Sequence, residues 1–200
     1  MERKVKAVLE LYAQLDVEIS EFRSKTALHC VEGCGKCCTK TDIEASPLEF
    51  LPWAFNEFLK GTAESTLEEL KIRENPICMI YRPLSLLESS SGSCGAYAYR
   101  GLICRLFGYG AGRDKLGQLR LSTCKIIKEG QHQNYTNAAT AISKGLYVPV
   151  FTDYYMNLGQ IDFNLGNRIV PINMALRFAL EEVLQYYAYR PFPSGLGNTA

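Results

Sequence analysis

The sequence lacks an excess of charge of either sign and has no long apolar run. Its 200 residues carry 22 basic and 21 acidic side chains, a net charge of +1, so no strong field attracts nucleic acid or an anionic membrane. No segment approaches the roughly 18 consecutive apolar residues of a membrane-spanning helix. The first residues enter an amphipathic pattern and do not resemble a secretory signal. These absences predict a cytoplasmic protein whose partner is neither nucleic acid nor membrane.

Histidine is also scarce, because His29 and His132 are the only two. Mixed cysteine and histidine metal sites are therefore a minor option. His132 has no recognisable triad companion, which favours a surface histidine over a catalytic base. Internal repeats, low-complexity tracts and linkers are absent as well, so we expect a single domain over residues 1–200. With 47% hydrophobic residues, a chain of this length can fold without disulfides.

The sequence is rich in cysteine, with eight in all and four of them within nine residues. In a reducing compartment, such a cluster indicates metal or redox chemistry and not a disulfide framework. All eight are candidate metal ligands. They are Cys30, Cys34, Cys37, Cys38, Cys78, Cys94, Cys104 and Cys124.

The clustered cysteines contain a Cys-x2-Cys pair, Cys34 and Cys37, which is typical of a metal-binding turn. Gly35 keeps that turn uncrowded. Neighbouring side chains generally project in different directions, so Cys37 and Cys38 are awkward ligands for one tetrahedral ion. The simplest prediction is two centres with four thiols each. Four thiolates suit zinc, a [4Fe–4S] cluster or a [2Fe–2S] cluster, and the sequence leaves this choice open.

Other interpretations of the cysteines remain. A free cysteine is often an inert core residue, and this alternative has most weight for Cys124, which stands alone. Oxidation can join Cys37 and Cys38 in a vicinal disulfide, although a reducing compartment disfavours it. Four thiolates around zinc leave an excess of negative charge, which basic neighbours would offset. The basic residues next to cysteines in sequence are Lys36, Lys40, Arg100 and Arg105.

The segment Cys30-x3-Cys34-x2-Cys37-Cys38 resembles the signature of the YkgJ family of zinc- or iron-chelating cysteine-cluster proteins. The resemblance covers about residues 28–125 and includes a Thr/Glu-led segment after the cluster. Its later parts are Pro76-Ile77-Cys78, Cys94-Gly95-Ala96-Tyr97 and the run from Arg100 to Phe107. It implies metal chelation, by zinc or iron–sulfur, through the cysteines.

One residue departs from that family pattern. Gly101 stands where the family usually has proline, which predicts a less rigid loop before Cys104 and leaves the ligand assignment unchanged. A similar signature also occurs in flagellin lysine N-methylases, which are larger proteins. That likeness hints at protein modification.

Apolar periodicity predicts a mainly α fold with an irregular cysteine-rich middle, about residues 28–125. A small β-hairpin between the regions of Cys78 and Cys94 is an option. A capping box formed by Thr41 and Glu44 is expected to start the second helix. Pro171 is expected at the first position of the last helix. The expected helices span residues 5–22, 42–58, 62–75, 134–144 and 171–190, so that C-terminal helices occupy 134–190.

Two further patterns have simple structural explanations. The glycine-rich stretch 108–112 follows no clear strand and precedes no clear helix, so a flexible turn is favoured over a phosphate-binding loop. Tyrosines near residues 97–99, 154–155 and 186–189 are interpreted as core and rim aromatics, with a binding platform as the alternative.

Three functions are compatible with these patterns. The first is an iron–sulfur protein with a redox or protein-modification role. The second is a structural-zinc domain with four-cysteine sites whose surface binds a partner protein. The third is a methyl-transferring enzyme that would bind S-adenosylmethionine. No catalytic constellation is identified, so enzymatic activity, the substrate and the protein partner are left open.

Overall fold

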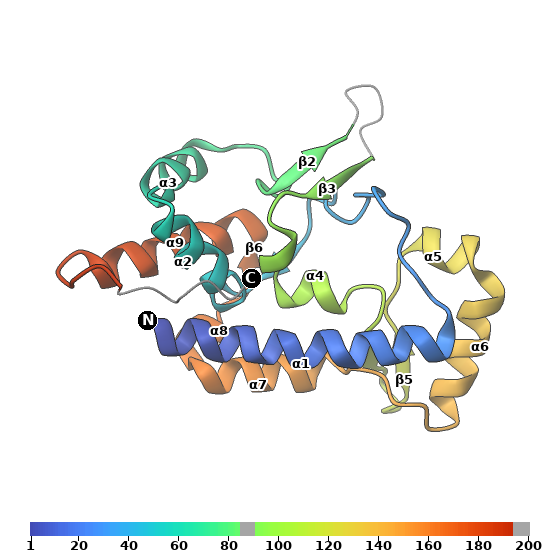
Figure 1. The fold of residues 1–200 in the computed structure, drawn as a ribbon. Coiled ribbons are helices and arrows are strands. Elements are labelled where there is room, and N and C mark those ends of the chain that lie inside the picture. The colour runs from blue at the N-terminus through green and yellow to red at the C-terminus, as the bar shows by residue number, and fades with distance from the viewer. Residues whose placement is uncertain (85–90, 194–200) are drawn as a thin grey trace.

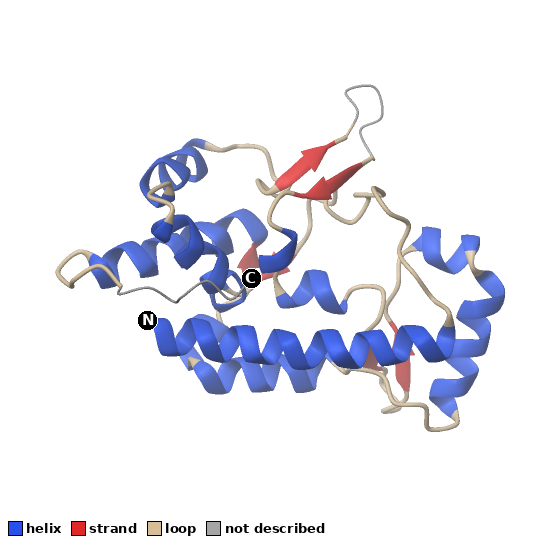
Figure 2. Ribbon diagram, in the orientation of Figure 1, coloured by secondary structure: helices blue, strands red, loops and turns tan. Residues whose placement is uncertain are grey.

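The computed structural model describes residues 1–84 and 91–193, which form mainly helices with three small two-stranded sheets (Figures 1 and 2). The predicted mainly α class is confirmed. The sequence also predicts a turn at residues 89–93 and a loose tail from residue 192, and residues 89–90 and 194–200 of these segments lie outside the described residues. Within the described residues, no helix has both the length and the apolar character needed to cross a bilayer.

The first helix, α1, runs from Glu2 to Thr26. Its buried face follows the predicted steps of three and four residues, because these positions lie on one side of a helix. The buried residues are Val5, Val8, Tyr12, Leu15, Ile19, Phe22 and Thr26. Ala27 ends the helix in a left-handed conformation, with φ of 56°, and turns the chain toward the cysteine cluster.

The core is one continuous cluster of buried side chains. The helices α2 (Leu51–Leu59) and α7 (Phe151–Ile161) pack against α1, while α9 (Ile172–Tyr187) packs against α2 and α3 (Ala63–Ile72). Figure 1 shows α1 and α7 side by side, with α2, α3 and α9 gathered at the N-terminal end of α1. The cysteine-bearing segments therefore lie on a helical scaffold.

The second predicted helix was placed wrongly at its start. Residues Glu44–Ala45 form strand β1, residues Pro47–Phe50 form a 3-10 turn, and α2 begins only at Leu51. The capping box is formed by Ser46 and Glu49 and not by Thr41 and Glu44. Proline lacks an N–H and has a fixed φ, so Pro47 suits the first position after this cap.

The third helix, α3, begins one residue after the expected start and ends at Ile72, three residues before the expected end. The sequence predicts Leu67, Leu70 and Ile72 on the inner side of this helix. Leu67 and Leu70 are buried, and Gly61 adopts the positive φ of a helix stop, +73°. The prediction was wrong for Ile72, which is 80% exposed and lies off the inner face.

The hairpin considered between the Cys78 and Cys94 regions is present. Strand β2 (Tyr81–Pro83) pairs antiparallel with β3 (Gly92–Cys94). Two further sheets were not predicted: β1 with β6 (Val170–Pro171), and β4 (Ala111–Arg113) with β5 (Leu119–Leu121).

Strand β4 corrects the flexible-turn interpretation of residues 108–112. Gly108 does turn, with φ of +101°, but Ala111 and Gly112 enter a paired strand. The backbone pairing with β5 orders this part of the stretch.

Apolar periodicity did not predict several of the helices, because they are short or rich in aromatic residues. They are α4 (Leu102–Leu106), α5 (Lys125–Gly130), α7 and α8 (Phe163–Gly166). The helix expected at 134–144 is α6 (His132–Ser143), and the last helix begins at Ile172, directly after Pro171. The sequence predicts an inner face for this helix formed by Ile172, Leu176, Ala179, Leu180, Val183 and Tyr187. The first five are buried, and Tyr187 is half-buried.

Candidate metal centre

All eight cysteines line one cavity of about 1840 Å³. The β2–β3 hairpin, α4 and the start of α5 contribute to its wall, together with the loop that follows α1 (Figure 1). The described cysteines are all free thiols, with no disulfide among them. The early cluster and the four later cysteines therefore line the same cavity, and their role as metal ligands stays a prediction.

Backbone contacts attach the early cluster to the β2–β3 hairpin. The amide of Gly92 donates to the carbonyl of Gly33 at 2.8 Å, and the Ser91 hydroxyl donates to the same carbonyl at 3.3 Å. Gly33 and Gly35 both have positive φ, +66° and +56°. A Cβ at Gly35 would lie 2.9 Å from the backbone nitrogen and oxygen of Gly92, so only glycine fits this approach.

Cys30 is attached to another lining residue of the cavity, Tyr109. Its amide donates to the Tyr109 hydroxyl at 2.8 Å. Next to it, His29 and Gln131 exchange two hydrogen bonds, of 3.1 Å from the His29 amide and 2.6 Å from the Gln131 side chain. These contacts join the start of the cluster to the C-terminal end of α5.

Cys124 caps the N-terminus of α5. Its Sγ accepts a hydrogen bond from the amide of Ile127 at 3.4 Å, and the side chain is half-buried against the cavity. Cys124 thus has a ligand-like setting as well as contact with the core.

Of the later cysteines, Cys94 lies in β3, Cys78 precedes β2 and Cys104 lies in α4. Cys94 pairs with Tyr81 in the β2–β3 ladder, and the amide of Tyr81 donates to the carbonyl of Cys78 at 3.0 Å. Burial raises the pKa of Cys78 to about 11 and raises the pKa of Cys104 further. Both are therefore neutral thiols at pH 7 without metal, and a bound metal would displace their protons.

The sulfurs of the adjacent pair, Cys37 and Cys38, lie 4.0 Å apart. Their hydrogen bond lowers the pKa of Cys37 to about 6 and raises the pKa of Cys38, because one proton is shared between them. The expectation that neighbouring side chains diverge does not hold here. Two ligands of a tetrahedral zinc lie about 3.8 Å apart, from a Zn–S bond of about 2.3 Å, so this pair can contact one ion. The division into two centres stays a prediction.

The thiols line the cavity but do not surround a common point. Across residues 1–84 and 91–193, no group of three or more His, Cys, Asp or Glu side chains is arranged to hold a metal ion. Neither histidine lines the cavity, so the available donors are thiols alone. Eight soft donors fit zinc or iron–sulfur ligation by their chemistry, although their geometry here is open.

A buried carboxylate whose contacts include a cavity-lining residue was not anticipated as a site residue. Glu49 is fully buried, and its side chain accepts hydrogen bonds from the amides of Ser46 and Ile103, both at 2.8 Å. Burial raises the pKa of Glu49, and these two bonds oppose the rise. The Ser-x-x-Glu spacing of the capping box was the available signal. Glu49 positions the start of α4, which carries Cys104.

The basic neighbours separate into two groups. Lys36, Lys40 and Arg100 line the cavity, but Arg105 does not. Arg105 is buried, forms an ion pair with Asp16 and donates to the carbonyls of nearby residues. The expectation that Arg105 offsets thiolate charge is thus wrong, because its charge is already paired with α1.

Gly101, the departure from the family pattern, is buried in the same region. A Cβ there would lie 2.8 Å from the Phe50 ring and 3.1 Å from the Glu49 carboxylate. Its carbonyl accepts the amides of Cys104 and Arg105, each at 3.1 Å. Close packing thus accounts for glycine at this position and holds the loop in place.

Comparisons of the chain with protein-family models, with curated proteins and with solved structures gave no match. The functional argument therefore depends on the cavity and its residues.

Proposed function

We propose that this protein binds metal through its eight cysteines, as iron–sulfur centres with a redox role. The observation that carries the proposal is the convergence of all eight thiols on one cavity. They come from the early loop, the hairpin, α4 and the start of α5, so local sequence does not account for their meeting. Iron–sulfur clusters are held by cysteine thiolates and supply electron transfer. Eight reduced cysteines also favour a reducing compartment such as the cytoplasm.

The spread of the thiols favours clusters over bare ions. A cavity of about 1840 Å³ is much larger than one or two ions require. In a cluster, iron and sulfide stand between the cysteine ligands, so the thiolates do not need to approach one point. The open arrangement of the donors agrees with that requirement.

The thiols can be divided by their neighbours. Burial raises the pKa of Cys30, and the thiols of Cys37, Cys34 and Cys124 add to the rise. The hydrogen bond with Cys37 and burial raise the pKa of Cys38, with contributions from Cys104 and Cys78. Besides burial, Cys37 also contributes to the raised pKa of Cys94 and Cys104, so it neighbours thiols of both groups. We call Cys30, Cys34, Cys37 and Cys124 the first thiol set. We call Cys38, Cys78, Cys94 and Cys104 the second thiol set.

The contacts along the backbone agree with this division. His29, which precedes Cys30, is hydrogen-bonded to Gln131 at the end of α5, and Cys124 is the N-cap of that helix. Cys94 pairs with Tyr81 in the hairpin, and the amide of Tyr81 donates to the carbonyl of Cys78. The Cys37–Cys38 pair lies where the two sets meet, so one adjacent thiol would serve each centre.

The direct test is the metal and acid-labile sulfide content of protein purified without oxygen, with a visible spectrum of the same sample. We expect iron with matching sulfide and a visible absorption that bleaches on reduction. Cys34→Ser should lose part of the iron, whereas Ser93→Ala, an exposed change beside Cys94, should retain it. Protein that contains no metal after anaerobic purification and reconstitution would refute the proposal.

A structural-zinc domain is the second candidate, because the 4.0 Å between the sulfurs of Cys37 and Cys38 is close to the spacing that tetrahedral zinc imposes. Zinc without sulfide or colour would favour it. In that case the bound metal would contribute folding free energy, and the search for function would turn to partner proteins. Saturable binding of S-adenosylmethionine would instead support a role in protein modification.

A further inference from the structure

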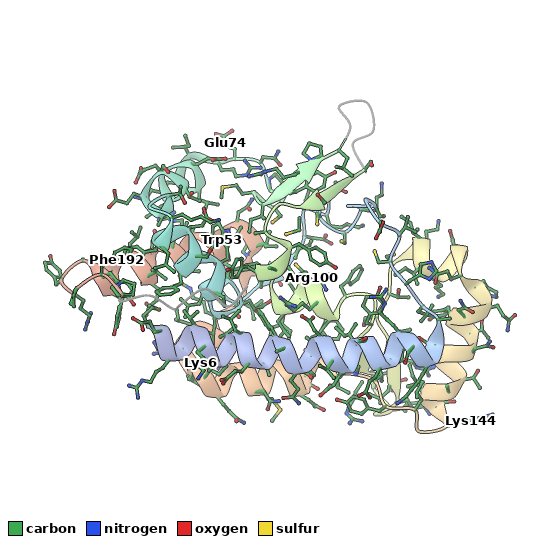
Figure 3. All side chains as sticks on the ribbon, viewed as in Figure 1. Lys6, Trp53, Glu74, Arg100, Lys144 and Phe192 are labelled. Atoms are coloured by element: carbon green, nitrogen blue, oxygen red, sulfur yellow. The ribbon has the colours of Figure 1, made fainter. Side chains whose placement is uncertain are left out.

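Arg100 carries a buried donor that has no acceptor. Among the described residues, its Nε has no hydrogen-bond partner and is shielded from solvent. An unsatisfied buried donor costs about 1–3 kcal/mol, and more when it is charged. The residue lies between β3 and α4 (Figure 3) and lines the cavity that holds the thiols. An acceptor is therefore expected inside that cavity.

The surroundings hold Arg100 in this position. Its guanidinium lies over the Tyr97 ring, 4.3 Å from the centroid, and its carbonyl accepts Nε of Arg105 at 3.1 Å. Arg105 is in turn paired with Asp16 and lies 4.5 Å from the centroid of the Tyr12 ring. The helix α1 thus fixes the backbone from which Arg100 projects, although no carboxylate pairs with its guanidinium among the described ion pairs.

The groups that Arg100 influences are thiols of both sets. Burial raises the pKa of Cys30 and of Cys94, and the Arg100 charge opposes both rises. Arg100 also contributes to the lowered pKa of Cys37, after the hydrogen bond with Cys38. A thiol is a weak acceptor, but a metal-bound thiolate is negatively charged and accepts hydrogen bonds well.

We propose that Arg100 donates a hydrogen bond to a metal-bound thiolate and thereby sets the reduction potential of the centre. This inference rests on the proposed iron–sulfur function and adds a positioning and tuning residue to it. A fixed positive charge stabilises the reduced centre, which carries one more negative charge, so Arg100 raises the potential. Arg105 has no such role because its charge is neutralised by Asp16.

The test compares Arg100→Gln and Arg100→Lys with Arg113→Gln in anaerobic protein. Arg113 is an exposed residue of β4 whose side chain contacts the carbonyl of Gly117. The reduction potential is measured in a redox titration followed by visible absorption. Arg100→Gln should lower this potential by at least 59 mV, which is a tenfold shift toward the oxidised centre for one electron. The potential of Arg100→Lys should lie between those of Arg100→Gln and the wild type, and Arg113→Gln should leave it unchanged.

The outcomes separate this inference from the proposed function. Wild-type protein without iron and sulfide overturns the iron–sulfur proposal whatever the variants do. A wild-type cluster whose potential is the same in Arg100→Gln and Arg100→Lys overturns the role of Arg100. If Arg100→Gln fails to fold, as shown by circular dichroism, Arg100→Lys decides the question alone.

If the metal is zinc, the same variants are tested by transfer of zinc to a chromogenic chelator. Arg100→Gln should release zinc at least tenfold faster than the wild type, because the thiolate loses its donor and its neighbouring charge. Equal release rates in the wild type, Arg100→Gln and Arg100→Lys would show that Arg100 does not act on the metal centre.

Discussion

The carboxylate of Glu49 accepts a hydrogen bond of 2.8 Å from the amide of Ile103, although 54 residues separate the two in sequence. The same carboxylate accepts the amide of Ser46 and closes the capping box before α2. One buried group thus joins the start of α2 to the start of α4. Because Cys104 follows Ile103 directly, this contact connects the helical core to the thiol cavity.

Glu49→Ala should destabilise the protein and reduce its metal content. The change leaves the amides of Ser46 and Ile103 buried without acceptors, each at a cost of about 1–3 kcal/mol. Glu49→Gln retains one oxygen acceptor and should lose less. Urea unfolding and metal analysis would measure both effects, with Glu68→Ala on the exposed face of α3 as the control. Equal stability of Glu49→Ala and the control would show that the buried bonds do not support the fold.

Cys37→Ala and Cys38→Ala test the division into two thiol sets. If each thiol serves its own set, each variant should lose about half of the bound metal, and the double variant should lose nearly all of it. Metal and sulfide analysis of the three proteins, with Thr39→Ala as the neighbouring control, would measure this. The same partial loss in the single variants and in the double variant would place both sulfurs on one centre.

Gly35→Ala should displace the early cluster from the hairpin. The new Cβ would meet the backbone of Gly92 at 2.9 Å, and the φ of +56° is strained for alanine. We expect a loss of stability of about 2 kcal/mol or more, from overpacking and strain together, and weaker metal binding. Thermal unfolding and metal content would be compared in the variant and the wild type.

Gly61→Ala is the matched control for this change. Gly61 has a similar positive φ, +73°, but a Cβ there would meet nothing within 4 Å. It should therefore lose about 1 kcal/mol from backbone strain alone and keep its metal. If both glycine variants lost the same stability and neither lost metal, the close approach of Gly35 to Gly92 would not be needed for stability or metal binding.

Much of the helical scaffold could be predicted from periodicity. The burial of Val5 through Phe22 on α1 and of Ile172 through Val183 on α9 follows from their spacing. The start of α2 could not, because two Ser/Thr-x-x-Glu spacings compete and only Pro47 favours the second. Short helices such as α4 contain too few residues to show a period, so tertiary contacts such as that of Glu49 determine them.

The candidate site was predictable in composition but not in geometry. All eight cysteines were identified from their number and spacing, and the structure places them on one cavity. Sequence adjacency did not distinguish Arg100 from Arg105, since the pairing of Arg105 with Asp16 depends on how α1 packs. The short distance between the sulfurs of Cys37 and Cys38 likewise depends on the fold of the loop.

The stability of the metal-free protein should fall as the pH rises above about 8.5. Burial raises the pKa of Cys78 from 9.0 to about 11, and it raises the pKa of Cys104 further. Below the ordinary thiol pKa, both the folded and the unfolded chain hold these protons, so the full stability is present. Above it, the unfolded chain loses protons that the folded chain keeps, which costs roughly 1–3 kcal/mol by about pH 10.

Bound metal would reverse this dependence, because ligating thiols would already be deprotonated and acid would compete with the metal. We therefore expect the melting temperature of chelator-treated protein to drop by several degrees between about pH 8 and pH 10, while that of the loaded protein drops on the acid side. Cys78→Ala should remove part of the alkaline slope in the metal-free state. Staying at or below about pH 10 limits the contribution of buried tyrosines such as Tyr155, whose pKa burial also raises. A melting temperature of the metal-free protein that stays level or rises across this range would mean that the cavity thiols are hydrated and readily ionised.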